Sequence, residues 1–119
     1  MAKTYYNIEK DGKVILWNIR SANTFLSRFM GLMTKKDLGG DGGIYLTPCG
    51  QVHTFMMRFC IDIVFLSHDH EVLHIESSLR PCRVTPYVRG SAGVLEAASG
   101  FARDAGLKTG DKLDFVKRG

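Results

Sequence analysis

The stretch from His53 to Leu66 constrains the fold of this chain most strongly. Its odd positions from 55 to 65 are all apolar, whereas its even positions include Arg58 and Asp62. A period of two is typical of a β-strand, because successive side chains of a strand point to opposite faces. This stretch is long for one strand, so we expect a break or bulge between Arg58 and Cys60. The pattern predicts a β-rich core with one wholly apolar face and one face that carries an acid and a base.

The remaining segments predict short strands joined by turns. We expect strands at 4–10, 13–19, 43–47, 71–77, 92–98 and 112–116, with a hairpin turn at Asp11–Gly12 between the first two. Residues 23–30 place apolar side chains at helical spacing, and residues 99–105 fit one or two helical turns. The prediction is a mainly β, mostly antiparallel domain of residues 1–119, a β-sandwich or a flattened barrel with one or two short helices.

Length and composition place the chain among ordinary globular proteins. Its 119 residues suit one domain with one sizeable core. No apolar run approaches the roughly 20 residues that span a bilayer, and no secretory leader is visible at the N-terminus. The three cysteines are an odd number without paired spacing, which favours free thiols. We therefore expect a cytoplasmic protein with no membrane span.

Positive charge is distributed unevenly along the chain. The net charge is +4, and residues 42–61 and 77–95 contain no Asp or Glu. The second of these segments carries Arg80, Arg83 and Arg89 together with two prolines, which predicts an extended surface loop or an edge strand. Such a basic face attracts an anion. The chain has no recognised nucleic-acid motif, so we do not expect a nucleic acid as partner.

Two carboxylates lie inside apolar strand patterns, Asp62 between two isoleucines and Glu96 between Leu95 and Ala97. Burying a carboxylate is costly unless it finds donors, and the candidate donors are Arg58, His53, backbone N–H groups or a helix N-terminus. One interpretation is a polar pocket floored by His53, Arg58, Asp62 and Glu96, with the arginine loop at its rim. The other interpretation is a buried anchor that holds the register of the strands.

Catalysis and metal binding are further interpretations of the same residues. His53 could act as a general base oriented by Asp62 or Glu96, but no motif supplies a nucleophile, and whether the chain is an enzyme stays open. His68 and His70 on a hairpin tip are a weak metal signal, and no zinc motif is present. We expect no metal or other cofactor.

Several short motifs follow one another in a recognisable order. They are Phe29–Met33, His53–Arg58, Ile61–Leu66, Val94–Glu96 with Gly100, and Gly106–Asp111. Together they resemble domain-of-unknown-function family 192 (DUF192) from about Ala22 to Val116. The resemblance implies a small, mainly β domain with no established activity. It also places Met33, Met57, Asp62, Glu96 and Gly100 at recurrent positions of the family.

The sequence as a whole favours a small binding or accessory module, monomeric or weakly dimeric. Its ligand would be a small anion or a partner peptide, held near His53, Arg58, Asp62 and Glu96, because an arginine fork suits carboxylate or phosphate. A small enzyme based on His53 is the alternative. A third possibility is an interaction module that offers the edge strand around 79–90 to another protein.

Overall fold

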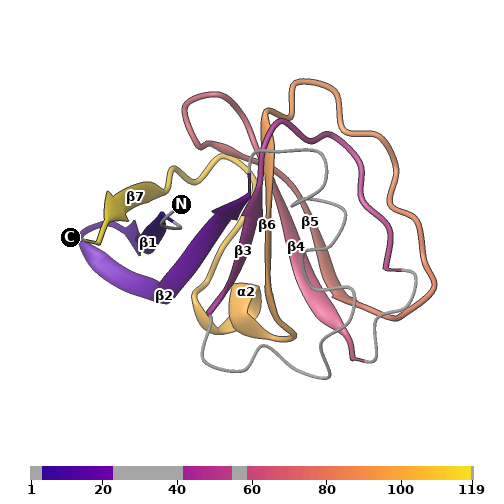
Figure 1. Ribbon diagram of the computed structural model, residues 1–119, viewed down its shortest axis with the longest axis horizontal. Helices are drawn as coiled ribbons and strands as arrows, with labels where there is room; N and C mark the ends of the chain where they lie inside the picture. Colours follow the sequence, from indigo (N-terminus) through magenta and orange to yellow (C-terminus); the bar gives the residue numbers. More distant parts are fainter. Residues whose placement is uncertain (1–3, 23–41, 55–58, 119) are drawn as a thin grey trace.

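A computed structural model describes residues 4–22, 42–54 and 59–118 of the chain. Its strands are β1 (Tyr5–Lys10), β2 (Lys13–Ala22), β3 (Gly43–Leu46), β4 (Ile61–Leu66), β5 (Val72–Leu79), β6 (Gly93–Ala98) and β7 (Asp114–Lys117), and its helix is α2 (Phe101–Asp104). In the described residues these strands form one sheet in the order β5-β4-β6-β3-β2-β1-β7 (Figure 1). Only β2 and β3 pair in parallel. The prediction of a mainly β, mostly antiparallel fold is confirmed, whereas the helix predicted at 23–30 lies outside the described residues.

The N-terminal hairpin forms as predicted. Asp11 and Gly12 both have positive φ, 53° and 79°, as the favoured two-residue hairpin turns require. β2 continues to Ala22, three residues past the predicted end, because its last part pairs with β3 from Ile19 to Ala22. That pairing partner is distant in sequence, so the local pattern did not predict it.

The long central stretch is interrupted, as its length predicted. β4 begins only at Ile61, and His53 forms an isolated bridge with Val84 instead of extending β4. All six residues of β4 are buried, Asp62 included, so the face that carries the predicted acid is covered as well. Both faces of β4 are covered, so its alternation separates two apolar cores rather than a core from solvent.

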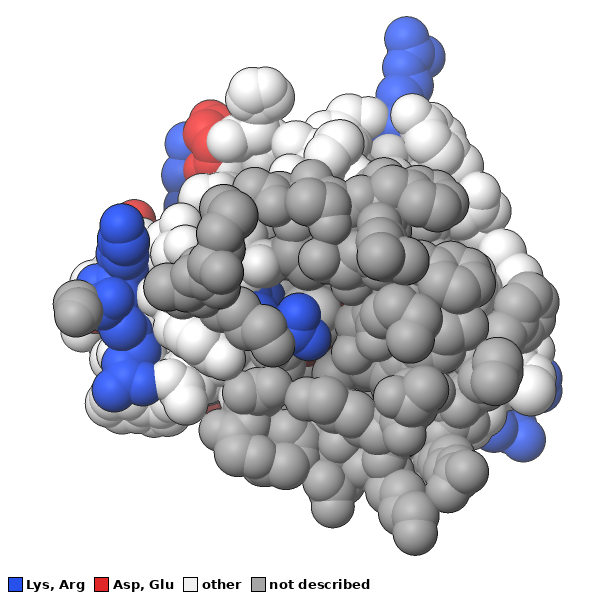
Figure 2. All heavy atoms as spheres, in the orientation of Figure 1, with Lys and Arg blue, Asp and Glu red and all other residues white. Residues whose placement is uncertain are grey.

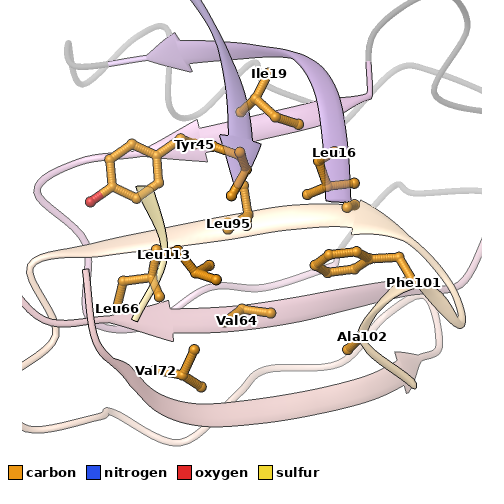
Figure 3. Packing of buried hydrophobic residues seen from close by; sticks show 12 residues of the cluster. Leu16, Ile19, Tyr45, Val64, Leu66, Val72, Leu95, Phe101, Ala102 and Leu113 are labelled. Carbon is orange, nitrogen blue, oxygen red and sulfur yellow. The ribbon is translucent and has the colours of Figure 1, made fainter. Parts of the chain in front are cut away.

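The two cores lie on opposite faces of the central strands. The larger core is made of Ile8, Leu16, Ile19, Tyr45, Val64, Leu66, Val72, Leu95, Ala97, Phe101, Ala102 and Leu113, most of which are labelled in Figure 3. The smaller core is made of Ile44, Leu46, Val52, Ile61, Ile63, Phe65 and Val94. The larger core includes residues from both edges of the sheet, Val72 of β5 and Leu113 beside β7. The smaller core is made by β3, β4, β6 and the segment around Val52.

The two outermost strands of the sheet meet at one end. Glu71, just before β5, forms a bridge with Lys112, just before β7. Val72 donates its N–H to the Asp111 carbonyl at 2.8 Å and accepts the Gly110 N–H at 2.8 Å. The sheet therefore curls around the larger core, which is closer to the predicted flattened barrel than to two stacked sheets.

Helix α2 closes one side of this curled sheet. It follows Gly100 in the left-handed region (φ 93°), and it buries Phe101 and Ala102 in the larger core. It confirms the helical turn predicted within 99–105. In the described residues, the structure contains no helix with the length and apolar character needed to cross a membrane.

Phe65→Ala tests the importance of the smaller core. Phe65 is fully buried, so its truncation should lower the free energy of unfolding by about 3–5 kcal/mol through lost burial and a residual cavity. Trp17→Ala is the control, since Trp17 is 62% exposed and should change stability little. Urea unfolding measures both. Equal effects of the two substitutions would contradict the assignment of Phe65 to a core.

Candidate functional site

Asp62 is an internal anchor rather than an open ligand. It is fully buried in β4, and its Oδ1 accepts the Ser78 N–H at 2.7 Å. Its Oδ2 accepts the N–H groups of Gly100 and Ala102 at 3.1 Å and 2.9 Å. The expectation that Asp62 finds backbone donors is confirmed. One carboxylate thus ties the end of β5 and the start of α2 to the middle of the sheet.

The two buried acids do not share a cleft. In the ladder between β4 and β6, Asp62 lies opposite Ala97, and Ile63 lies opposite Glu96. Residues opposite each other in a ladder share a face of the sheet. Ala97 belongs to the larger core and Ile63 to the smaller one, so the two carboxyl groups point to opposite faces. The structure therefore does not bring the two acids of the predicted pocket together, because the register of β4 and β6 sets Asp62 and Glu96 on opposite faces of the sheet.

Glu96 is buried on the face of the smaller core. It is only 5% exposed, and its ladder neighbours are Ile44 on β3 and Ile63 on β4. Among the described residues, no hydrogen bond or ion pair reaches its carboxyl group. Burial raises the pKa of Glu96 to about 7, since an apolar environment disfavours the charged form. This carboxyl group can therefore gain or lose a proton near neutral pH.

His74 and Glu76 of β5 form a polar pair on the same face of the sheet as Glu96. Glu76 is the other ladder neighbour of Ile63, so Glu76 and Glu96 flank Ile63 from β5 and β6. The Nε2 of His74 lies 2.5 Å from Oε2 of Glu76, and the His74 ring packs against Phe65 with ring centroids 5.7 Å apart. The sequence pattern alone did not single out this pair. The sequence signal for the pair is that His74 and Glu76 are two residues apart, which puts both side chains on one face of a strand.

His53 lies in a two-stranded ribbon that joins two acid-free segments. Residues 50–54 run antiparallel to residues 80–89, and we call these two segments the basic ribbon. Its ladder includes the Thr54 N–H to the Arg83 carbonyl at 2.8 Å, the Thr85 N–H to the Val52 carbonyl at 2.9 Å, and the Val88 N–H to the Gly50 carbonyl at 2.8 Å. The Thr54 hydroxyl also donates to the Arg80 carbonyl at 2.7 Å. These bonds hold the ribbon over the smaller core.

The basic ribbon presents the predicted arginines to solvent. Arg80, Arg83, Arg89 and His53 are all exposed, and no ion pair engages the three arginines within the described part of the chain. Arg58 lies outside the described residues. Basic side chains also gather at the left of Figure 2, where Figure 1 draws β1, β2 and β7, so positive charge is not confined to the ribbon. What distinguishes the ribbon is the lack of acids in both of its segments.

A cleft with several aromatic rings opens elsewhere on the molecule, and we call it the aromatic cleft. It has a volume of about 630 Å³ and is lined by Tyr6, Ser21, Tyr45, Thr47, Pro48, His68, His70, Ala92 and Phe115. Our sequence reasoning considered His68 and His70 only as a weak metal signal. The cleft was missed because its lining comes from strands far apart in sequence. Among the described residues, no group of three or more His, Cys, Asp or Glu side chains gathers closely enough to hold a metal ion.

The curled sheet, its buried carboxylate anchor and its two apolar cores define a small β-rich domain. The family model of DUF192, described as "Uncharacterized ACR", matches residues 6–115. The chain belongs to this family, as its motifs indicated.

Known relatives agree with this assignment. A UPF0127 protein of Pyrococcus furiosus is 31% identical over 114 residues, which cover 92% of this chain and 95% of that protein. A UPF0127 protein of Thermococcus sibiricus is 28% identical over 109 residues, covering 87% of this chain and 70% of that protein. A crystal structure of a protein of unknown function from Novosphingobium aromaticivorans matches with a TM-score of 0.80 at 23% identity, covering 94% of this chain and 84% of the other. That likeness shows the fold alone.

Asp62→Asn tests the anchor. The substitution replaces one carboxylate oxygen by an amide N–H₂, which is itself a donor and cannot accept a backbone N–H. The free energy of unfolding should therefore fall by about 3 kcal/mol. Hydrogen exchange of the Ser78, Gly100 and Ala102 amides should accelerate more than that of amides elsewhere. Asp11→Asn is the matched control, because Asp11 is exposed and Asn suits its positive φ. A stable variant with unchanged exchange at these amides would refute the anchor.

Glu96→Gln tests the buried carboxyl group. Folded Glu96 keeps its proton up to about pH 7, whereas the unfolded chain releases it near the ordinary pKa of 4.5. The folded state binds more protons in that window, so rising pH should lower its free energy of unfolding, by roughly 3 kcal/mol in all.

Urea unfolding across this pH range measures the effect. Glu96→Gln should remove this part of the pH dependence, whereas Asp104→Asn, at an exposed carboxyl group, should retain it. Parallel pH profiles for the wild type and Glu96→Gln would show that the carboxyl group is not protonated in the folded state.

Proposed function

We propose that this domain is a binding module whose basic ribbon binds an acidic segment of a partner protein. The observation that carries the proposal is the ladder between residues 50–54 and 80–89, which unites two segments without acids. Arg80, Arg83 and Arg89 each offer a guanidinium fork that suits a carboxylate. An extended peptide with several carboxylates matches such a ribbon better than one compact ion does.

Apolar groups of the ribbon support the choice of a protein partner. Val84 is 55% exposed and Tyr87 is 70% exposed, and both lie between the arginines in sequence. Exposed tyrosine and arginine are enriched where proteins bind each other. A ligand that offered only charge would leave these apolar groups unused.

A catalytic role for His53 is the less favoured alternative. Both oxygens of Asp62 already accept backbone N–H groups, and that carboxylate faces the larger core. Glu96 is buried, whereas His53 is exposed. These positions do not favour either acid as the orienter of a general base, so we propose binding rather than catalysis.

We also propose that the protein works in a reducing compartment such as the cytoplasm. All three cysteines of the chain, Cys49, Cys60 and Cys82, fall within the described residues, and none of them is joined in a disulfide. Free thiols are typical of reducing compartments.

The test compares two triple substitutions of equal charge. In the first, Arg80, Arg83 and Arg89 become Gln. In the control, Lys13, Arg103 and Lys117 become Gln, since these three are also exposed but lie outside the ribbon. Fluorescence anisotropy reports the binding of a labelled peptide of alternating Glu and Ser, with a Gln–Ser peptide as the neutral reference.

We expect the ribbon variant to bind the acidic peptide about tenfold more weakly, since three exposed ion pairs contribute up to about 1 kcal/mol each. The control variant should bind nearly as well as the wild type. Equal losses in both variants would show that net charge alone attracts the peptide. If free phosphate or citrate at equal charge displaced the labelled peptide, the ligand would be a small anion rather than an acidic peptide.

A further inference from the structure

The aromatic cleft lies apart from the basic ribbon and has a different chemistry. Four of its lining rings contact one another, those of Tyr6 of β1, Tyr45 of β3, His70 before β5 and Phe115 of β7. Tyr6, His70 and Phe115 are only partly buried, so their rings border the open volume of the cleft. Figure 3 shows Tyr45 at the end of the larger core, with its hydroxyl directed away from the other labelled side chains.

The rings hold each other in fixed positions. The Phe115 ring centroid lies 4.7 Å from that of Tyr45 and 5.8 Å from that of Tyr6, both in edge contact. The His70 ring stacks on Phe115 at 4.1 Å. The His70 backbone is also held, because its carbonyl accepts the Leu113 N–H at 3.0 Å and its N–H donates to the Ser67 carbonyl at 2.9 Å. These contacts within the protein make the aromatic wall of the cleft a preformed surface.

Tyr45 lies directly over the backbone of β6. A Cβ at Gly93 would come within 2.1 Å of the Tyr45 hydroxyl oxygen, so only glycine leaves room for the ring in this position. Burial raises the pKa of Tyr45, which keeps its hydroxyl protonated and able to donate. Gly93 therefore leaves the space in which the Tyr45 hydroxyl lies.

The described lining favours a neutral ligand. Among the described residues it contains no Asp, Glu, Lys or Arg, so a phosphate, a carboxylate or an ammonium group would meet no opposite charge from them. Burial also lowers the pKa of His70, which favours the neutral ring. The polar groups that remain are hydroxyls and imidazoles, from Tyr6, Ser21, Tyr45, Thr47, His68 and His70. A hydroxyl can both donate and accept a hydrogen bond. The Thr47 hydroxyl already donates to the Ala92 carbonyl at 3.0 Å, so it offers a ligand its acceptor oxygen.

The angles between the rings disfavour a flat ligand. Phe115 meets Tyr6 and Tyr45 at 64° and 65°, and Tyr45 meets His70 at 88°. Among the described rings, the one stacked pair, His70 and Phe115, is already in contact, so these rings leave no parallel slot for a nucleobase. A puckered ring with apolar C–H faces and hydroxyls on its rim matches this combination of an aromatic wall and dispersed hydroxyls.

We propose that the aromatic cleft is a binding site for a neutral sugar. The aromatic wall packs against the C–H face of the sugar ring, and the Tyr45, Thr47 and His68 side chains hydrogen-bond its hydroxyls. This site uses none of the residues of the basic ribbon, so it stands or falls independently of the proposed protein partner.

Saturation-transfer NMR on the full chain tests the site. The probes are neutral monosaccharides and disaccharides of glucose, galactose, mannose and N-acetylglucosamine, with adenosine as the flat, uncharged comparison. Tyr6→Ala removes a partly exposed ring, and Thr47→Val removes a hydroxyl at nearly constant volume. Tyr87→Ala removes an exposed aromatic ring of the basic ribbon and is the matched control. Circular dichroism establishes that each variant is folded.

We expect at least one saccharide to bind the wild type and Tyr87→Ala equally. Its affinity should fall about tenfold in Tyr6→Ala and measurably in Thr47→Val, as the loss of one ring contact and one hydrogen bond implies. The proposal is overturned if no saccharide of the panel shows transfer. It is also overturned if transfer persists unchanged in both cleft variants, or if adenosine binds the cleft and the sugars do not.

Discussion

The fold depends on a single buried carboxylate that satisfies three backbone donors. Asp62 accepts N–H groups from Ser78, Gly100 and Ala102, which belong to the end of β5 and the start of α2. Ser78 and Gly100 both have positive φ, so each marks a point where the chain departs from regular strand geometry. A charged acceptor forms stronger hydrogen bonds than a neutral one. Asp62 thereby offsets the cost of these departures while remaining fully desolvated.

The contrast with Glu96 follows from the donors that each acid meets. Asp62 stays compatible with burial because the backbone surrounds it with N–H groups, whereas Glu96 lies between isoleucines of neighbouring strands. With burial as its dominant influence, Glu96 prefers its neutral form up to about pH 7. Two residues that look alike in sequence therefore meet different surroundings, because environment rather than residue type sets the cost of burying a carboxyl group.

The two proposed binding surfaces arise from the same curled sheet. The smaller core requires a cover, and the basic ribbon provides it while its outer side carries arginines to solvent. The larger core opens at one end of the sheet, where β1, β3 and β7 bring their aromatic residues together. One surface is basic, whereas the described lining of the other carries no Asp, Glu, Lys or Arg, so the two can take different ligands without competing.

The alternation of residues determined which segments become strands, and the positive φ of the Asp11–Gly12 turn follows from local preference alone. Membership of DUF192 was also visible, because the motifs occur in order along the chain. The sequence further indicated that Asp62 must find donors, since an apolar strand cannot hold an unpaired carboxylate.

Only the tertiary structure decided which face each residue occupies. The register between β4 and β6 placed Asp62 and Glu96 on opposite faces, and a shift of one residue in that pairing would have put them on the same face. The aromatic cleft likewise depends on the contact between Tyr6 and Phe115, which lie near opposite ends of the sequence. Local patterns carry no information on such register and long-range pairing, because these follow from how whole strands pack against one another.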